Sequence, residues 1–269
     1  MAVPALAFER VTCAFADRGG HGRYTAVKDT SFAIGTGEFV SLVGPTGCGK
    51  STLLNVAAGL LAPTSGAVLV GGEPLSGLNR RAGYLFQADA LMPWRNAREN
   101  VEAGLVFAGT PPKEASQRAG QWLRRVGLSG FGDRYPHELS GGMRKRVGLA
   151  QVLILQPEIL LMDEPFAALD AQTRQLMENE LLDLWSAERR SVVFITHDLE
   201  EAIALSDRVV LLSAGPATRP IGEFAIDLPR PRDVAEIGLT PRFLELHGRI
   251  WGALRSEVLK AYAISQRLA

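Results

Sequence analysis

Eight residues, "GPTGCGKS" at positions 44–51, constrain the fold of this 269-residue chain more than any other segment. They fit the pattern G-x-x-x-x-G-K-[ST], with the apolar run "EFVSLV" before them and the periodic run "TLLNVAAGLL" after them. Those neighbours predict a buried strand and a helix with Leu53, Leu54 and Ala57 on one face. Loop N–H groups and the positive end of that helix would surround phosphates, with Lys50 at the β/γ-phosphates and Ser51 on Mg²⁺. An accidental Gly-rich turn is the alternative, and the flanking elements disfavour it.

Strand and helix patterns alternate on both sides of a long helical stretch. Two β-rich segments, 5–15 and 25–34, are separated by a turn-prone, Gly-rich stretch. Further strands are predicted at 37–44, 65–72, 81–87, 158–163, 191–197 and 208–213, and helices at 49–61, 171–188 and 198–206. Short apolar strands alternating with helices indicate an α/β fold with a mostly parallel sheet covered by helices.

Only helical patterns occur in residues 89–157, at 96–109, 113–128 and 141–156, which predicts an inserted all-helical subdomain. Residues 1–88 and 158–219 would then form one core. Residues 220–269 would form a C-terminal extension, with a strand and a terminal amphipathic helix packed on that core. We expect a single domain overall.

Polar side chains end three of the predicted strands. "ILLMDE" delivers Asp163, a candidate Mg²⁺ ligand, and Glu164, a candidate base for the attacking water that would point to the other face of the pleat. His197 ends the strand "VVFITH" and could reach the γ-phosphate, and Gln87 ends "RAGYLFQ" and could bind Mg²⁺ or the water. Two solvated carboxylates and a structural histidine are the ordinary alternatives, which the phosphate loop makes less favoured.

The composition excludes several classes of function. Lys plus Arg and Asp plus Glu number 29 each, which gives no general attraction to nucleic acid. Two cysteines indicate a reducing compartment. The sequence contains no apolar run of membrane-spanning length, and its N-terminus does not resemble a signal peptide. We therefore expect a cytosolic protein whose membrane role, if any, comes through a partner.

The segment "YPHELSGGMRKRV" at 135–147 places a Ser and two Gly residues at the start of a basic helical stretch. Taken alone, this is a capped helix start. Together with "GPTGCGKST", "FQADALMPW", "LLMDEPFAALD" and "FITHDLEEA", which occur in family order over nearly the whole chain, it resembles the nucleotide-binding subunit of an ABC transporter. "ALMPW", "PFAALDAQTR" and "LPRPRD" are similar to the nitrate/sulfonate/taurine branch of bacterial importers, which also includes transporters of thiamine-precursor pyrimidines.

The resemblance implies a P-loop NTPase (RecA-like) core with an antiparallel β subdomain, and ATP and Mg²⁺ as cofactors. It implies a homodimer with two ATP molecules at the interface. Each ATP would be held by the phosphate loop of one subunit and by "LSGGM" of the partner, residues 139–143, which is called the signature motif below. Gln87 would be catalytic as well as a metal ligand, and Asp170 would bridge the subunits. The other residues expected around the nucleotide are Gly44, Pro45, Thr46, Gly47, Cys48, Gly49, Thr52, Ser140, Gly141 and Gly142.

The same resemblance assigns Phe15 to stacking on adenine, with Tyr24 as the other candidate. The segment after Gln87, with Met92 and Trp94, would receive an integral membrane permease, although both residues could instead be core. A solute-binding protein would then act indirectly. The chain would lie peripherally on the cytoplasmic face of the inner membrane.

Two rival functions use the same phosphate loop. One is an ABC-type ATPase that moves no solute, such as a cofactor-assembly or DNA-associated protein. The short interval from Gln87 to Ser140, which has no heptad run, disfavours the DNA-associated versions. The other rival is a P-loop kinase, which would leave "LSGGM" without a role.

Overall fold

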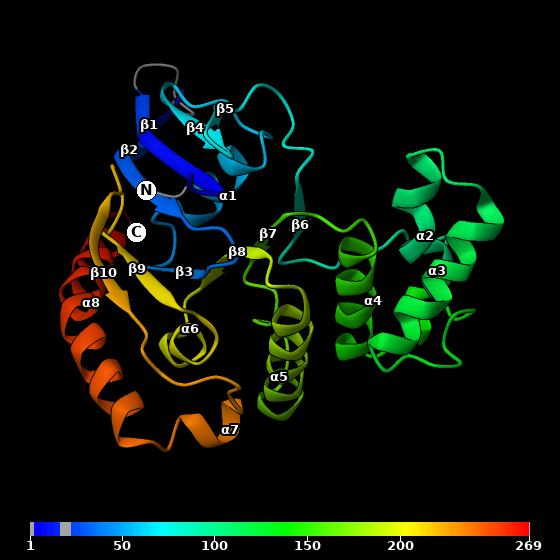
Figure 1. Cartoon of the computed structure of the whole chain (residues 1–269). Coiled ribbons are helices and arrows are strands. Elements are labelled where there is room, and N and C mark those ends of the chain that lie inside the picture. Colours follow the sequence, from blue (N-terminus) through cyan, green and yellow to red (C-terminus); the bar gives the residue numbers. More distant parts are fainter. Residues whose placement is uncertain (1–2, 17–22, 269) are drawn as a thin grey trace.

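The computed structural model describes residues 3–16 and 23–268, and the order of its elements is that of an α/β protein. Most of the predicted Gly-rich turn between the first two strands lies outside the described residues. Figure 1 shows the small β1–β2 sheet at one end of the molecule, and helices α2, α3 and α4 at the other end. A larger sheet lies between them.

The larger sheet has the strand order β10–β9–β3–β8–β7–β6. Pairing is parallel except between β10 and β9. Every residue of β3, β7 and β8 is buried, because helices cover both faces. The bounds are β3 Phe39–Val43, β6 Ala82–Leu85, β7 Ile159–Asp163, β8 Ser191–Thr196, β9 Arg208–Leu212 and β10 Pro220–Ala225.

A four-stranded antiparallel sheet with the order β2–β1–β4–β5 packs over helix α1 (Lys50–Ala57). Its strands are β1 (Leu6–Ala16), β2 (Arg23–Ile34), β4 (Ser65–Val70) and the two-residue β5 (Glu73–Pro74). Strand β5 was not predicted. Val40 and Leu42 of β3 face α1, whereas Phe39 of the same strand faces the opposite core with Trp185. Because successive side chains of β3 point to opposite faces of the sheet, the strand contributes to a hydrophobic core on each face.

The three predicted helices of the inserted segment are present as α2 (Ala97–Phe107), α3 (Pro112–Arg125) and α4 (Gly141–Leu153), with a short 3₁₀ helix η1 (Pro136–Glu138) between the last two. Asn96 begins α2 with a capping box, in which its side chain accepts from the Glu99 N–H and Glu99 accepts from the Asn96 N–H. Trp122 and Leu123 of α3 are buried against α2 and α4.

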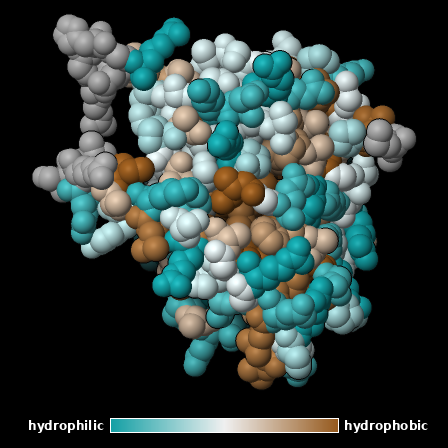
Figure 2. All heavy atoms as spheres, turned by 90° about the vertical axis from the view of Figure 1, so that its left-hand side faces the viewer, coloured by the Kyte–Doolittle hydropathy of each residue, from teal (hydrophilic) through white to brown (hydrophobic). Residues whose placement is uncertain are grey.

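The predicted strand and helix of the C-terminal extension are confirmed as β10 and α8 (Pro241–Leu268), and the short helix α7 (Val234–Ile237) between them was not predicted. Phe243, Leu246, Ile250 and Leu254 lie on one face of α8 and pack near α6 (Leu199–Leu205), the helix before β9. Figure 2 shows the side of the molecule formed by α8 and β10, where hydrophobic residues form separate patches among hydrophilic ones. No helix in the described part of the chain combines the length and the apolar character needed to cross a membrane.

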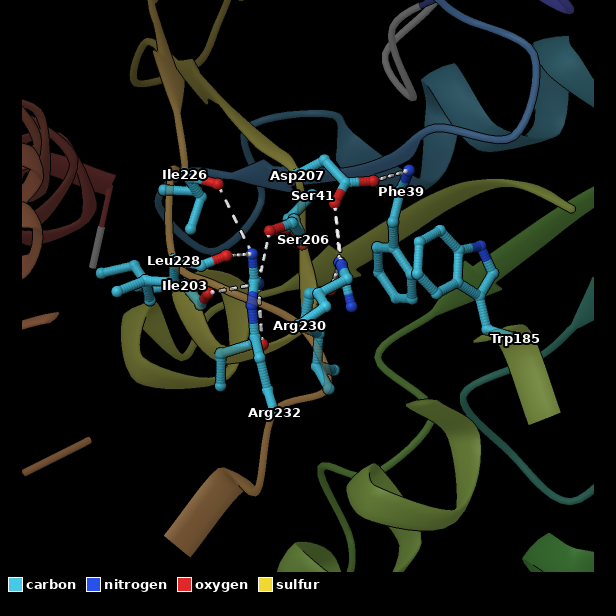
Figure 3. Close-up of polar contacts among 12 residues, drawn as sticks. Phe39, Ser41, Trp185, Ile203, Ser206, Asp207, Ile226, Leu228, Arg230 and Arg232 are labelled. Atoms are coloured by element: carbon cyan, nitrogen blue, oxygen red, sulfur yellow. Dashed lines mark hydrogen bonds and ion pairs between the residues drawn. The ribbon is translucent and has the colours of Figure 1, made fainter. Parts of the chain in front are cut away.

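Two arginines before α7 attach the extension to the sheet (Figure 3). Arg232 is 8% exposed, and its guanidinium donates to five carbonyl oxygens: those of Ile203, Ala204, Ser206, Ile226 and Leu228. Three of these belong to the C-terminal end of α6 and the residue after it, where helix carbonyls lack intrahelical donors. Burial and the neighbouring Arg230 lower the pKa of Arg232 to about 10, so the side chain remains a cation at neutral pH.

Arg230 makes the second attachment. Its guanidinium donates to Asp207 Oδ1 (2.8 Å) and to the Leu205 carbonyl (2.7 Å), and it lies 4.2 Å from the centroid of the Trp185 ring. Asp207 Oδ2 in turn accepts from the Phe39 N–H at the start of the central strand β3 (3.0 Å). The extension is therefore bonded to the core that carries the phosphate loop.

Candidate functional site

The phosphate loop lies between β3 and α1 and adopts a conformation that its glycines permit. Gly47 and Gly49 have φ of 75° and 102°, which a residue with a Cβ rarely adopts. No side chain caps α1 at Gly49, so the N–H groups of its first turn remain available to a ligand in the loop. The Lys50 ammonium is buried and donates to the carbonyls of Gly44 (2.8 Å) and Pro45 (3.1 Å), which places it inside the loop.

The predicted loop residues form one continuous cradle. Thr46 and Gly47 are exposed at its tip, whereas Cys48 is buried beneath it, where burial raises the pKa of the thiol. Ser51 and Thr52 continue into the first turn of α1. A cradle with an open tip, backbone donors and a lysine inside fits a chain of phosphates.

Ser51 Oγ donates to Asp163 Oδ1 at 3.1 Å, which joins the loop to the end of β7. Burial, together with the negative charge of Glu164, raises the pKa of Asp163, and the Ser51 hydrogen bond only partly offsets this. The carboxylate thus lies in a site whose negative charge is not fully compensated. A hydroxyl and a carboxylate oxygen are donors that hard divalent cations prefer.

Glu164 follows the last residue of β7 and has φ of 43°, in the left-handed region. Strand β7 ends at Asp163, so strand alternation alone does not set the direction of the Glu164 side chain, and the expectation that it points to the other face of the pleat stays a prediction. Its N–H donates to the Ile195 carbonyl of β8 (3.0 Å). This strained turn aims the carboxylate at the loop after β8.

His197 and Gln87 converge on that carboxylate from the neighbouring strands. His197 Nδ1 lies 3.1 Å from Glu164 Oε2, and Gln87 Nε2 lies 3.5 Å from the same oxygen. The side chain of Glu164 is 19% exposed and that of His197 is 56% exposed, so a small molecule can reach both. The structure therefore brings together three of the predicted catalytic residues at the carboxyl ends of β6, β7 and β8.

The signature motif forms the predicted capped helix start. Ser140 is the N-cap of α4, and its hydroxyl accepts from the Met143 N–H at 3.3 Å. Gly142 lies close to helix α5 (Ala171–Glu188), since a Cβ at Gly142 would lie 2.8 Å from Thr173 Cγ2. Among the described residues, no hydrogen bond joins 140–142 to the phosphate loop of the same chain.

Asp170 lies immediately before α5 and caps that helix, accepting from the Thr173 N–H at 3.0 Å. Hydrogen bonds from the backbone and side chain of Thr173 lower the pKa of its carboxyl, so it is ionised. Ser140 and Asp170 thus border the contact between α4 and α5.

Phe15 and Tyr24 are opposite each other on β1 and β2 and are 39% and 44% exposed. Both candidates for an adenine contact therefore lie at one place on the small sheet. The preference for Phe15 stays a prediction. Trp94 is 73% exposed, which excludes the alternative that it belongs to the core, whereas Met92 is partly buried.

Several residues of the site were not predicted. Tyr84 Oη lies within hydrogen-bonding distance of two acceptors, Asn55 Oδ1 (3.1 Å) and Asp163 Oδ2 (3.4 Å), and can donate its single proton to either. Burial with the Asp163 charge raises the pKa of Tyr84 far above the usual value. Tyr84 lies in the strand that Gln87 follows, and the parallel neighbour of that strand is β7. The sequence motifs do not show that Tyr84 lies beside Asp163. Knowledge of the strand order would have predicted this contact, because β6 and β7 are neighbours.

The sequence patterns also did not predict a role for the basic residues of helix α4. Arg144 Nε donates to Asp89 Oδ2 at 2.7 Å, and Lys145 Nζ donates to the Gln87 carbonyl at 2.6 Å. Burial raises the pKa of Asp89, but the hydrogen bonds from Arg144 and Lys145 outweigh it and the net shift is downward. Helix α4 therefore holds the segment that carries Gln87.

Truncating the two exposed aromatics separately will distinguish their roles. We expect Phe15→Ala to raise the Kd for ATP by at least about fivefold, because a ring stacked on adenine contributes about 1 kcal/mol beyond the area that it buries. Tyr24→Ala removes an equally exposed ring from the opposite strand and should leave the Kd almost unchanged. Titration with a fluorescent ATP analogue measures both, and the reverse ranking would assign the contact to Tyr24.

A phosphate loop at the carboxyl edge of a parallel sheet, with Asp163 at the end of β7 hydrogen bonded to Ser51 and Glu164 directly after it, defines a P-loop nucleotidase. Residues 27–167 match the family model described as "ABC transporter". The chain belongs to this family: it is an ABC ATP-binding subunit that hydrolyses ATP.

Relatives and a solved structure agree with this membership. The chain is 46% identical over 257 residues to an uncharacterized ABC transporter ATP-binding protein of Methanocaldococcus jannaschii, covering 95% of this chain and 93% of the relative. It is 44% identical over 246 residues to the taurine import ATP-binding protein of Burkholderia pseudomallei, covering 90% and 94%. A dimeric ATP-binding cassette in a post-hydrolysis state with ADP and phosphate superposes with a TM-score of 0.73 at 32% identity, covering 83% of this chain and all of that one. The predicted fold class is confirmed.

Proposed function

We propose that this ATPase powers solute import through a separate membrane permease, as a member of the nitrate/sulfonate/taurine type. The observation that carries the proposal is the convergence of Glu164, His197 and Gln87 beside the Ser51–Asp163 pair. These residues would supply the metal ligands and the base for ATP hydrolysis from one subunit. The import role is supported by the relative named for taurine import.

Ser51 and Asp163 would hold Mg²⁺, and Gln87 would complete the protein's share of its ligands. The buried, under-compensated carboxylate of Asp163 supports this assignment. When bound, the ion would neutralise charge on the β- and γ-phosphates.

The chain's own residues would do the remaining chemistry. Backbone N–H groups of residues 46–51 would bind the phosphates, and Lys50 would exchange its carbonyl partners for the β/γ-oxygens. Glu164 would orient the attacking water and accept its proton, with the carboxylate held by His197. Catalysis would come mainly from positioning and electrostatic stabilisation.

The signature motif would act on a second copy of the chain. Ser140 is exposed and, within the described residues, makes no hydrogen bond to its own phosphate loop, and the solved relative is dimeric. Ser140, Gly141 and Gly142 would therefore contact the γ-phosphate bound by the partner, so that a two-fold dimer buries two ATP molecules. Asp170 would cross the same interface.

The permease would contact the turn before α2. Asn100 is fully buried, and its amide nitrogen donates to the carbonyls of Met92, Arg95 and Asn96. That hydrogen bonding shapes the turn and leaves Trp94 projecting into solvent. An exposed tryptophan on a fixed turn suits a groove for a partner helix. The subunit would thus lie on the cytoplasmic face of the cell membrane.

Specificity for the solute would reside in the permease and a solute-binding protein rather than in this chain. The taurine relative directs the first assays to sulfonates, and nitrate and pyrimidine precursors follow from the same branch.

Affinity isolation from solubilised membranes tests the import role. We expect the tagged wild-type chain to recover a polytopic permease, and Trp94→Ala to lose most of it while keeping its basal ATPase activity. Leu239→Ala is the matched control, since Leu239 is 82% exposed on the C-terminal extension. Recovery of the wild-type chain only from the soluble fraction would favour the cofactor-assembly rival instead.

A further inference from the structure

Arg174, in the first turn of α5, contacts two loops of the candidate site without lying in either of them. Its Nη2 donates to the Leu169 carbonyl at 3.2 Å, directly before Asp170. Its Nη1 donates to Asp198 Oδ2 at 3.3 Å, directly after His197. The Arg174 guanidinium therefore links the Leu169 carbonyl, next to Asp170, to the Asp198 side chain, next to His197.

The Asp198 end of this link is itself rigid. Asp198 Oδ1 accepts from the N–H groups of Glu200 (2.9 Å) and Glu201 (3.2 Å), which caps α6, and the Asp198 N–H donates to Thr196 Oγ1 (3.0 Å). The backbone on either side of His197 is thus fixed to β8 and to α6. A displacement of Asp198 would move the His197 ring away from Glu164 Oε2, which it now contacts at 3.1 Å.

Behind Arg174, the space between α5 and α6 holds two buried carboxyl groups, Glu178 and Glu201, which are 3% and 7% exposed. They are hydrogen bonded to each other, and burial is the main cause that raises the pKa of both. The positive charge of Arg174 acts on both carboxyl groups and partly offsets this rise. The Arg174 side chain is itself 30% exposed, so its position depends on the hydrogen bonds to Leu169 and Asp198.

The Leu169 end of the link faces the signature helix. Thr173, one residue before Arg174, is the neighbour that a Cβ at Gly142 would strike at 2.8 Å, and Leu169 Cδ2 lies 3.8 Å from the corresponding position at Gly141. These close approaches would couple a displacement of α4 to the first turn of α5.

We infer that Arg174 is a positioning residue, which ties the loop of Asp170 to His197 and makes the placement of His197 depend on the state of the subunit interface. Arg174 acts on hydrolysis through His197 and does not contact the nucleotide. The inference rests on the proposed role of His197 in the ATPase reaction and is independent of the permease.

The test is steady-state ATPase kinetics of the full chain. We expect Arg174→Met to lower kcat about tenfold or more while KM for ATP changes less than twofold, and Arg174→Lys to recover part of kcat. Asp198→Asn breaks the same ion pair from its other end and retains a side chain that can cap α6, so it should show the same split. Arg125→Met is the matched control, because Arg125 pairs with Glu188 at the far end of α5. It should turn over normally.

A double-mutant cycle with His197→Ala decides whether Arg174 acts through the histidine. We expect Arg174→Met to have no further effect on kcat once His197 is absent. An equal fold-loss in both backgrounds, or a change confined to KM, would overturn the inference. Wild-type turnover in His197→Ala alone would remove the proposed role of His197 and with it this inference, while the permease assay would still stand.

Discussion

Glu164→Gln is expected to bind ATP as the wild type does and to lose at least about two orders of magnitude in turnover. The glutamine side chain has the same shape and can still contact His197 and Gln87, and the backbone hydrogen bond to Ile195 that holds the residue at φ 43° is unchanged. It cannot accept a proton from the attacking water. ATP-bound dimers should therefore accumulate, because hydrolysis no longer reopens them.

Phosphate release and size-exclusion chromatography with ATP and Mg²⁺ measure the two parts of this prediction. Glu158→Gln is the matched control, since Glu158 lies just before β7, at the opposite end of the same strand, in an exposed ion pair with Arg81. It should leave both turnover and oligomeric state unchanged. Wild-type turnover in Glu164→Gln would contradict the assignment of Glu164 as the base.

Arg232→Met is expected to lower the free energy of unfolding by about 3 kcal/mol, which corresponds to a fall in Tm of roughly 6–12 °C for a domain of this size. Methionine has a similar length and fills the space. It leaves the carbonyls of Ile203, Ala204 and Ser206 at the end of α6 without donors, in a place that water does not reach.

Urea unfolding followed by circular dichroism measures the loss. Arg242→Met is the control: Arg242 also makes ion pairs within the extension, with Asp227 and Glu245, but on the surface, so its removal should have little effect. Equal stability of Arg232→Met and the wild type would mean that the extension is not held to the core by this side chain.

The order of the elements and the location of the site could be predicted because both depend on local patterns. Gly47 and Gly49 predict a loop with positive φ angles, and apolar runs such as "ILLMD" predict strands buried on both faces. Once the strands are parallel, their carboxyl ends share one edge. Asp163, His197 and Gln87 therefore had to come near the phosphate loop.

Contacts between elements that are far apart in the chain could not be predicted from the sequence patterns. No sequence pattern singled out Arg232, yet it is buried and hydrogen bonded both to carbonyls at the end of α6 and to carbonyls of the segment after β10. Nothing local shows that Asn100, in a helix, shapes the turn that exposes Trp94. For Glu164, strand alternation was an incomplete basis for predicting the side-chain direction, because the residue follows the end of β7, has a positive φ and is hydrogen bonded through its N–H to the β8 backbone.

The strand order also governs when the nucleotide site can form during synthesis on the ribosome. β3, which leads into the phosphate loop, lies between β8 and β9, the last parallel strands to be translated. The β1–β2 hairpin can pair as soon as it emerges, but β3 gains neither neighbour until Ser191 and the residues after it have left the exit tunnel. Pairing between strands so far apart in the chain is slow. A nascent chain that ends before Ser191 carries the whole phosphate motif and still lacks the sheet that shapes it.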